Sequence, residues 1–137
     1  MTAAVFDASV IVKLVVDEPG YEDAARAYEA VDDCIVPDWA LLECAQAIWK
    51  KTRRREITPG RSVEIVDALG RLRLTSLTSS DLVAPAYEMA VALAHPVYDC
   101  LYLALAVREG APLVTADARL RDVGVAAGLD VMWVGER

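Results

Sequence analysis

Short apolar runs alternate with segments of helical periodicity along the whole chain, and this alternation restricts the possible folds more than any other feature. Parallel strands need long crossover connections, which are usually helices and are right-handed. The sequence therefore predicts an α/β domain with a mostly parallel sheet covered by helices on both faces. Strands are expected at residues 3–6, 34–37, 72–77, 112–115 and 131–134.

Helical patterns fill the intervals between the expected strands. Asp38 is expected to cap the third helix and Thr58 the fourth, with Pro59 in its first turn. The length suits one domain, and no repeat or low-complexity tract divides residues 1–137. Helices are expected at residues 9–16, 21–31, 39–56, 58–71, 80–95, 98–109 and 117–127.

Charge is distributed unevenly along the chain. The net charge of −7 argues against a protein that coats nucleic acid by bulk charge, yet residues 50–61 hold six cations and one anion. Five of these cations fall within six residues, which exceeds what a solvated helix end needs. A solvated helix end stays one interpretation, and contact with a phosphate backbone is the other. The five are Lys50, Lys51, Arg53, Arg54 and Arg55.

Three cysteines without paired spacing predict neither a disulfide framework nor a zinc site, so Cys34, Cys44 and Cys100 are expected to be buried thiols. The single histidine, His95, is expected in a loop. The first residues lack the pattern of a signal peptide, and no run of 18 apolar residues occurs. We therefore expect a cytoplasmic protein that does not span a membrane.

Four acidic residues occupy positions where they could bind a ligand or a metal ion. Asp7 and Asp117 each follow an expected strand, so both should lie at the carboxyl edge of the sheet, where open parallel sheets bind ligands. Glu43 and Asp99 interrupt otherwise apolar helices. Each acid alone is also explained by capping, by the helix dipole or by exposure. Together, four acids without a visible partner charge suit Mg²⁺ or Mn²⁺, which prefer carboxylate oxygens.

Hydroxyl side chains flank the two strand-end acids. Ser9 and Thr115 are candidates to orient these acids or to bind a metal-bound water, although hydroxyls at helix starts are also ordinary caps.

Four segments carry a family resemblance: Asp7-Ala8-Ser9-Val10, Leu42-Glu43-Cys44-Ala45, Tyr98–Ala106, and Thr115-Ala116-Asp117 with Leu120. In their order and spacing they resemble the PIN-domain ribonucleases, and specifically the VapC toxins of type II toxin–antitoxin pairs. The resemblance covers nearly the whole chain. One departure is Gln46, where many relatives carry Asn three residues after the glutamate.

The resemblance implies a three-layer α/β/α domain with a parallel five-stranded sheet, and an endoribonuclease that hydrolyses RNA phosphodiester bonds. It implies an acidic pocket for Mg²⁺ or Mn²⁺, in which Asp7 and Asp99 bind metal directly while Glu43 and Asp117 hold a second metal or its waters. Ser9, Thr115 and Gln46 would support these acids, and the basic run at 50–55 would bind RNA.

The resemblance also implies partners. Apolar residues on the helices at 21–31, 39–56 and 58–71 exceed what one sheet face covers, although helices can bury such residues against each other. We therefore expect a homodimer with a groove that takes a VapB-like antitoxin, which would place a basic side chain among the four acids.

Two other classes of protein remain possible at this point. A receiver domain has similar length and an acidic Mg²⁺ pocket, but it needs paired acids after its first strand, and Asp7 has no acidic neighbour. A PIN-like scaffold that binds RNA or protein without turnover is the second alternative.

Overall fold

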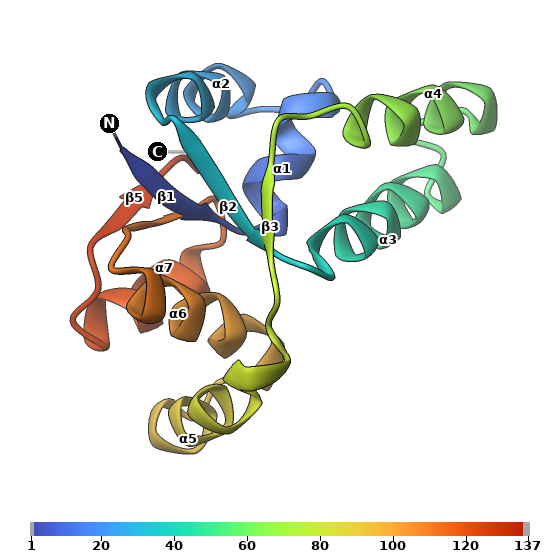
Figure 1. Cartoon of the computed structure of the whole chain (residues 1–137). Helices are drawn as coiled ribbons and strands as arrows, with labels where there is room; N and C mark the ends of the chain where they lie inside the picture. The colour runs from blue at the N-terminus through green and yellow to red at the C-terminus, as the bar shows by residue number, and fades with distance from the viewer. Residues whose placement is uncertain (1, 136–137) are drawn as a thin grey trace.

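The computed structural model describes residues 2–135, in which a central sheet lies between two layers of helices (Figure 1). All neighbouring strands are parallel, and their order is β3-β2-β1-β4-β5. The predicted three-layer α/β/α fold is confirmed. The receiver alternative is wrong, because that fold has the order 2-1-3-4-5. The strands are β1 (Ala3–Phe6), β2 (Asp33–Pro37), β3 (Thr75–Leu77), β4 (Leu113–Thr115) and β5 (Val131–Trp133).

Seven α-helices and one short 3-10 helix connect the strands within the described residues. They are α1 (Ala8–Val15), α2 (Tyr21–Ala30), α3 (Ala40–Arg53), α4 (Pro59–Leu69), η1 (Ser80–Leu82), α5 (Val83–Leu93), α6 (Val97–Glu109) and α7 (Ala118–Ala126). Thr58 caps α4 and Pro59 starts it, as predicted.

Alternate side chains of the strands point to opposite faces of the sheet and build two cores. Phe6 of β1 packs with residues of α1 to α4 on one face, and its neighbour Val5 packs with residues of α5 to α7 on the other. The second core encloses α6, where Cys100–Ala106 are all buried. This burial on every side explains why the helix is apolar all round.

Several predicted element ends are wrong. Asp38 does not cap α3: its Oδ1 accepts a hydrogen bond from Ser79 Oγ at 2.7 Å, and Trp39 occupies the N-cap position. The helix ends at Arg53 and not near residue 56, because Arg55 has a φ of 63°. The third strand begins at Thr75 and not at residue 72.

The segment predicted as one helix over 80–95 is η1 followed by α5. Ala94 ends α5 in the left-handed region with a φ of 51° and returns the chain toward α6. His95 lies in the loop between α5 and α6, as predicted, and its side chain is buried.

All three cysteines are free and buried, as predicted. Within residues 2–135, no single helix is long and apolar enough to cross a membrane. The helical segments Ser80–Leu93 and Val97–Glu109 reach the required length and apolar composition only when they are counted together. The chain bends by 115° between them.

Candidate active site

All four predicted acids lie at or near the N-termini of helices. Asp7 is the N-cap of α1 and Asp117 the N-cap of α7, while Glu43 and Asp99 lie in the first turns of α3 and α6. Helix N-termini favour negative charge, so each position suits a carboxylate. Because β1 pairs with β4, the two N-cap residues lie at the same edge of the sheet.

Asp7 is the most buried of the four, with 4% of its surface exposed. Its Oδ1 accepts hydrogen bonds from Ser9 Oγ at 2.6 Å and from the Val10 amide at 3.3 Å. Its Oδ2 accepts from Thr115 Oγ1 at 2.7 Å. Both carboxylate oxygens are therefore held by neutral donors.

The two hydroxyls that hold Asp7 also accept hydrogen bonds from the loop after β4. Ser9 Oγ accepts from the Ala116 amide at 3.0 Å, and Thr115 Oγ1 accepts from the Asp117 amide at 3.0 Å. This network joins the ends of β1 and β4, so Ser9 and Thr115 orient the Asp7 carboxylate and hold the backbone at Ala116 and Asp117.

Burial raises the pKa of Asp7 to about 7, and the nearby charge of Asp117 adds to this rise, although the hydrogen bonds from Ser9, Thr115 and Val10 oppose it. No cation pairs with Asp7 among the described residues. The structure thus holds a buried carboxyl whose negative charge is not compensated.

Glu43 reaches the site from α3. Its Oε2 accepts a hydrogen bond from the buried Tyr102 hydroxyl at 3.1 Å. Burial raises the pKa of Glu43, the Tyr102 bond opposes the rise, and the charge of Asp99 adds to it. The sequence interpretation gave Tyr102 no role. Its position three residues after Asp99, on the same helix face, was the available signal.

Asp99 is half-buried, and its Oδ2 lies 2.8 Å from Nε2 of His95. Asp99 therefore has a partner within the chain that the sequence pattern did not reveal. The histidine precedes it by four residues and folds back onto α6 after the turn at Ala94. A protonated His95 would neutralise part of the acidic charge.

Charge interactions among the four acids fall into two pairs. The charge of Asp117 raises the pKa of Asp7, and the charge of Asp99 raises the pKa of Glu43. Cys44 lies between the pairs: burial raises the pKa of its thiol to about 12, and the charges of Glu43 and Asp7 add to this. Oxygen donors and an uncompensated buried carboxyl fit a hard divalent cation. Within residues 2–135, however, no three metal-binding side chains already form a metal-binding group.

An open groove of about 900 Å³ adjoins Glu43 between α3 and the start of α6. Trp39 lines it and packs edge-to-face on Tyr98 and Tyr102 at centroid distances of 5.6 and 5.2 Å. Gln46 also lines this groove, and its side chain forms no hydrogen bond with Glu43 in the described part of the chain. The remaining lining residues are Leu42, Ala45, Trp49, Lys50 and Tyr98.

The basic run does not form one uniform face. Lys50 is exposed and lines the groove, Lys51 pairs with Glu18 at 2.7 Å, and the Arg53 guanidinium lies 5.4 Å from the Trp49 ring centre. Arg54 and Arg55 follow the last helical residue and are exposed.

A family model for the PIN domain matches residues 4–126 of this chain. The chain belongs to the PIN-domain family. It is 30% identical over 120 residues to Ribonuclease VapC3 of Pyrobaculum aerophilum, an alignment that covers 86% of this chain and 92% of that protein.

Solved structures of PIN-domain proteins share the fold. VapC20 of Mycobacterium tuberculosis, described as a sarcin-ricin loop cleaving toxin, has a TM-score of 0.69 at 16% identity, with 92% of this chain and 95% of that chain covered. VapBC2 of Rickettsia felis, bound to a DNA fragment from its promoter, has a TM-score of 0.67 at 16% identity, with 96% and 98% covered. The PIN fold predicted from the four motifs is confirmed.

Proposed function

We propose that this PIN-domain chain is a metal-dependent endoribonuclease that cleaves RNA phosphodiester bonds and acts as the toxin of a VapBC-type pair. The observation that carries the proposal is the buried Asp7 carboxyl, uncompensated by any cation in the described chain and coupled to Asp117. Similarity to a curated VapC ribonuclease supports the same reaction. A PIN-like scaffold without turnover is the alternative that the assay below tests.

We assign Asp7 and Asp99 as direct ligands of Mg²⁺ or Mn²⁺, and Glu43 and Asp117 as holders of a second ion or of its waters. When bound, the cation makes water a better nucleophile and offsets the charge that develops on the phosphoryl oxygens. The chain's own groups prepare the site: Ser9 and Thr115 orient Asp7, and Tyr102 holds Glu43.

Cleavage of a single-stranded RNA by the purified chain, with Mg²⁺ or Mn²⁺ and then with excess chelator, tests the proposal. Asp99→Asn keeps the size of the side chain and removes its charge, so the rate should fall more than about 100-fold, since loss of an outer-shell partner alone costs about 10–100-fold. Asp122→Asn, which removes an exposed carboxylate on α7, should cleave at the unaltered rate. The metal assignment is rejected if Asp99→Asn cleaves RNA as fast as the wild type does, whether the chelator is present or absent.

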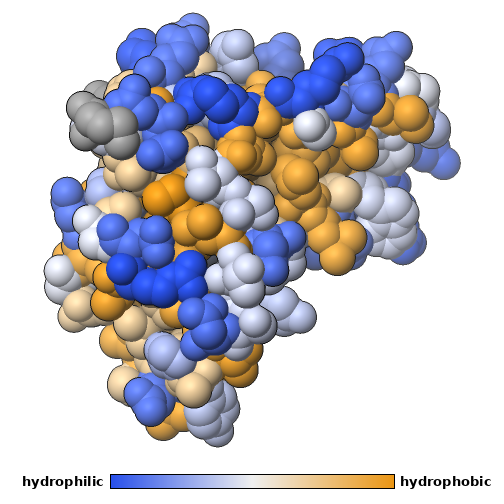
Figure 2. Space-filling view, in the orientation of Figure 1, coloured by the Kyte–Doolittle hydropathy of each residue, from blue (hydrophilic) through white to orange (hydrophobic). Residues whose placement is uncertain are grey.

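The antitoxin and homodimer proposals draw support from apolar residues left exposed on α3 and α4, where Figure 2 shows hydrophobic surface. Leu42, Trp49 and Val63 are 75%, 51% and 70% exposed, whereas Ile48 and Ile65 are buried between the helices. The groove beside Glu43 would let an amphipathic antitoxin segment place a basic side chain among the acids.

Two measurements test these partners. Light scattering should give twice 14.9 kDa for a homodimer, and a monomer at micromolar concentration would reject it. The product of the neighbouring small gene should copurify on co-expression, and its failure to do so would remove the antitoxin from the proposal.

A further inference from the structure

A trough of about 310 Å³ extends from the acidic site along α1 and α3. Residues of the site line it, together with a cluster of three charged side chains from outside the site. Among the described residues that line the trough, the cluster supplies the only cations. The site residues are Ser9, Glu43 and Ala116, and the cluster consists of Lys13, Glu18 and Lys51.

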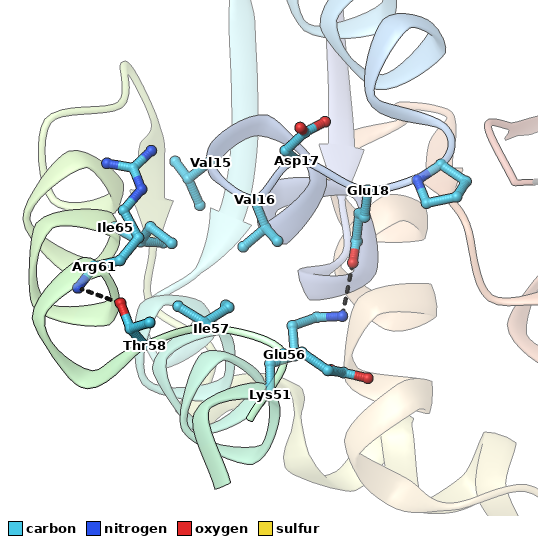
Figure 3. Close-up of a pocket in the computed structure, with 11 residues that line it drawn as sticks. Val15, Val16, Asp17, Glu18, Lys51, Glu56, Ile57, Thr58, Arg61 and Ile65 are labelled. Carbon is cyan, nitrogen blue, oxygen red and sulfur yellow. Dashed lines mark hydrogen bonds and ion pairs between the residues drawn. The ribbon is translucent and has the colours of Figure 1, made fainter. Parts of the chain in front are cut away.

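Glu18 lies between the two lysines of the cluster. Lys13 Nζ lies 3.4 Å from its Oε1. Lys51 Nζ lies 2.7 Å from its Oε2, as Figure 3 shows. Lys13 Nζ also donates to the Pro19 carbonyl oxygen at 2.6 Å. The side chains of Lys13, Glu18 and Lys51 are only 15%, 17% and 26% exposed, so the cluster is held in place.

Two ammonium groups share one carboxylate, which leaves the cluster with a net charge of +1. An ammonium group has three N–H donors. Lys51 uses one of them in the described structure and Lys13 uses two, so donors remain beside a site that otherwise carries negative charge. On the far side of Lys51, the pocket of Figure 3 holds three acids (Asp17, Glu18 and Glu56) against two cations (Lys51 and Arg61), a net charge of −1. The trough balances its two lysines against Glu18 and Glu43, so an anion is better placed on the trough side.

Resting on the proposed ribonuclease function, we propose that Lys13 and Lys51 bind a backbone phosphate of single-stranded RNA that flanks the phosphate being cleaved. Glu18 positions both lysines and competes with that phosphate for their donors. The subsite thus attracts the polyanion to an acidic pocket and limits how tightly it is held.

The proposal predicts an order of RNA affinities. Glu18→Gln raises the charge of the cluster to +2, whereas Lys13→Gln and Lys51→Gln each lower it to zero. Anisotropy of a fluorescent oligouridylate, measured with chelator at several salt concentrations, should show tighter binding by Glu18→Gln and weaker binding by each lysine variant. Each change should be roughly 1.4- to 5-fold, the range of one partly exposed ion pair. Each lysine variant should also lose about 0.7 from the salt slope.

Matched control variants distinguish RNA binding at this subsite from the effects of overall charge and of altered folding. Asp122→Asn removes an acid from an ion pair on α7, and Arg71→Gln removes an exposed cation paired with Asp67. Glu18→Asp retains the charge and should not tighten binding. Circular dichroism melts report folding for every variant.

The inference is overturned if Glu18→Gln binds no tighter than Asp122→Asn, or if the lysine variants bind like Arg71→Gln. If the cluster only ties α1 to the following turn, its variants should melt at a lower temperature than the wild type. Their affinities for RNA should then equal that of the wild type. Wild-type protein that neither binds nor cleaves single-stranded RNA would reject the proposed function itself, whereas cleavage with unchanged variant affinities rejects the subsite alone.

Discussion

The two pairs of acids in the site are held in different ways. Asp7 accepts three hydrogen bonds, and Asp117 Oδ1 accepts two more from the amides of Arg119 and Leu120. Glu43 and Asp99 each have one side-chain partner on the described chain, namely Tyr102 and His95. The strand-end pair is thus fixed by backbone and hydroxyls, and the helix pair by single side chains.

The two pairs of acids therefore differ in how freely their side chains can move. The strand-end acids are held in place, because moving Asp7 or Asp117 would break hydrogen bonds that cap α1 and α7. Glu43 lines an open groove and Asp99 is half-buried, so these two side chains have more freedom to move. Three predictions test the contrast, from the largest expected effect to the smallest.

The largest effect concerns pH. Because the folded pKa of Asp7 is about 7 against an ordinary value of 3.8, the folded state binds more protons between these values than the unfolded state does. The metal-free protein should therefore lose stability as pH rises from about 4 through 7, by a total of the order of a few kcal/mol. Urea unfolding with chelator at several pH values measures this.

Asp7→Asn supplies the comparison for the pH experiment. It cannot ionise, so most of the decline should disappear, and the smaller remainder should come from Glu43, whose pKa is raised in the same direction. A decline of equal size in Asp7→Asn would show that other groups cause it.

The second effect concerns the hydroxyl that links the strand-end acids. Thr115→Val removes the bond to Asp7 and leaves the Asp117 amide without its acceptor, so unfolding free energy should fall by about 2 kcal/mol. Thr52→Val removes a hydroxyl that bonds only to the Ile48 carbonyl within α3, and it should cost less than about 1 kcal/mol. Equal losses in both variants would contradict the special role of Thr115.

The smallest effect concerns the helix pair. Tyr102→Phe deletes one hydrogen bond to Glu43, whose carboxylate can turn to water in the groove, so the loss should be about 1 kcal/mol or less. Tyr98→Phe removes a hydroxyl from a 70% exposed side chain and should fall within about 0.5 kcal/mol of wild type. A loss in Tyr102→Phe as large as that in Thr115→Val would remove the distinction between the pairs.

The same contrast explains what the sequence could predict. The strand-end acids follow apolar runs, and parallel strands bring such residues to one edge by a general rule. The apolar pattern therefore located Asp7 and Asp117, and the surrounding hydroxyls Ser9 and Thr115 followed from their positions beside them.

Other features depend on how distant elements pack. The bond from Ser79 to Asp38 spans 41 residues and replaces the local cap that the sequence suggested. His95 meets Asp99 because a non-glycine residue, Ala94, adopts a left-handed conformation, for which the sequence gives no signal. Tyr102 meets Glu43 only because α3 and α6 approach each other across the edge of the sheet.

The position of β1 in the middle of the sheet has a consequence for synthesis of the chain. The bond from Thr115 to Asp7 spans 108 residues, and β4 is the strand that brings it into place. A nascent chain that has emerged only as far as Pro96 contains Asp7 and Glu43 but neither Asp99 nor Asp117. Since chains emerge from the N-terminus and long-range pairing comes late in folding, the acidic site is completed only when almost all of the protein has left the ribosome.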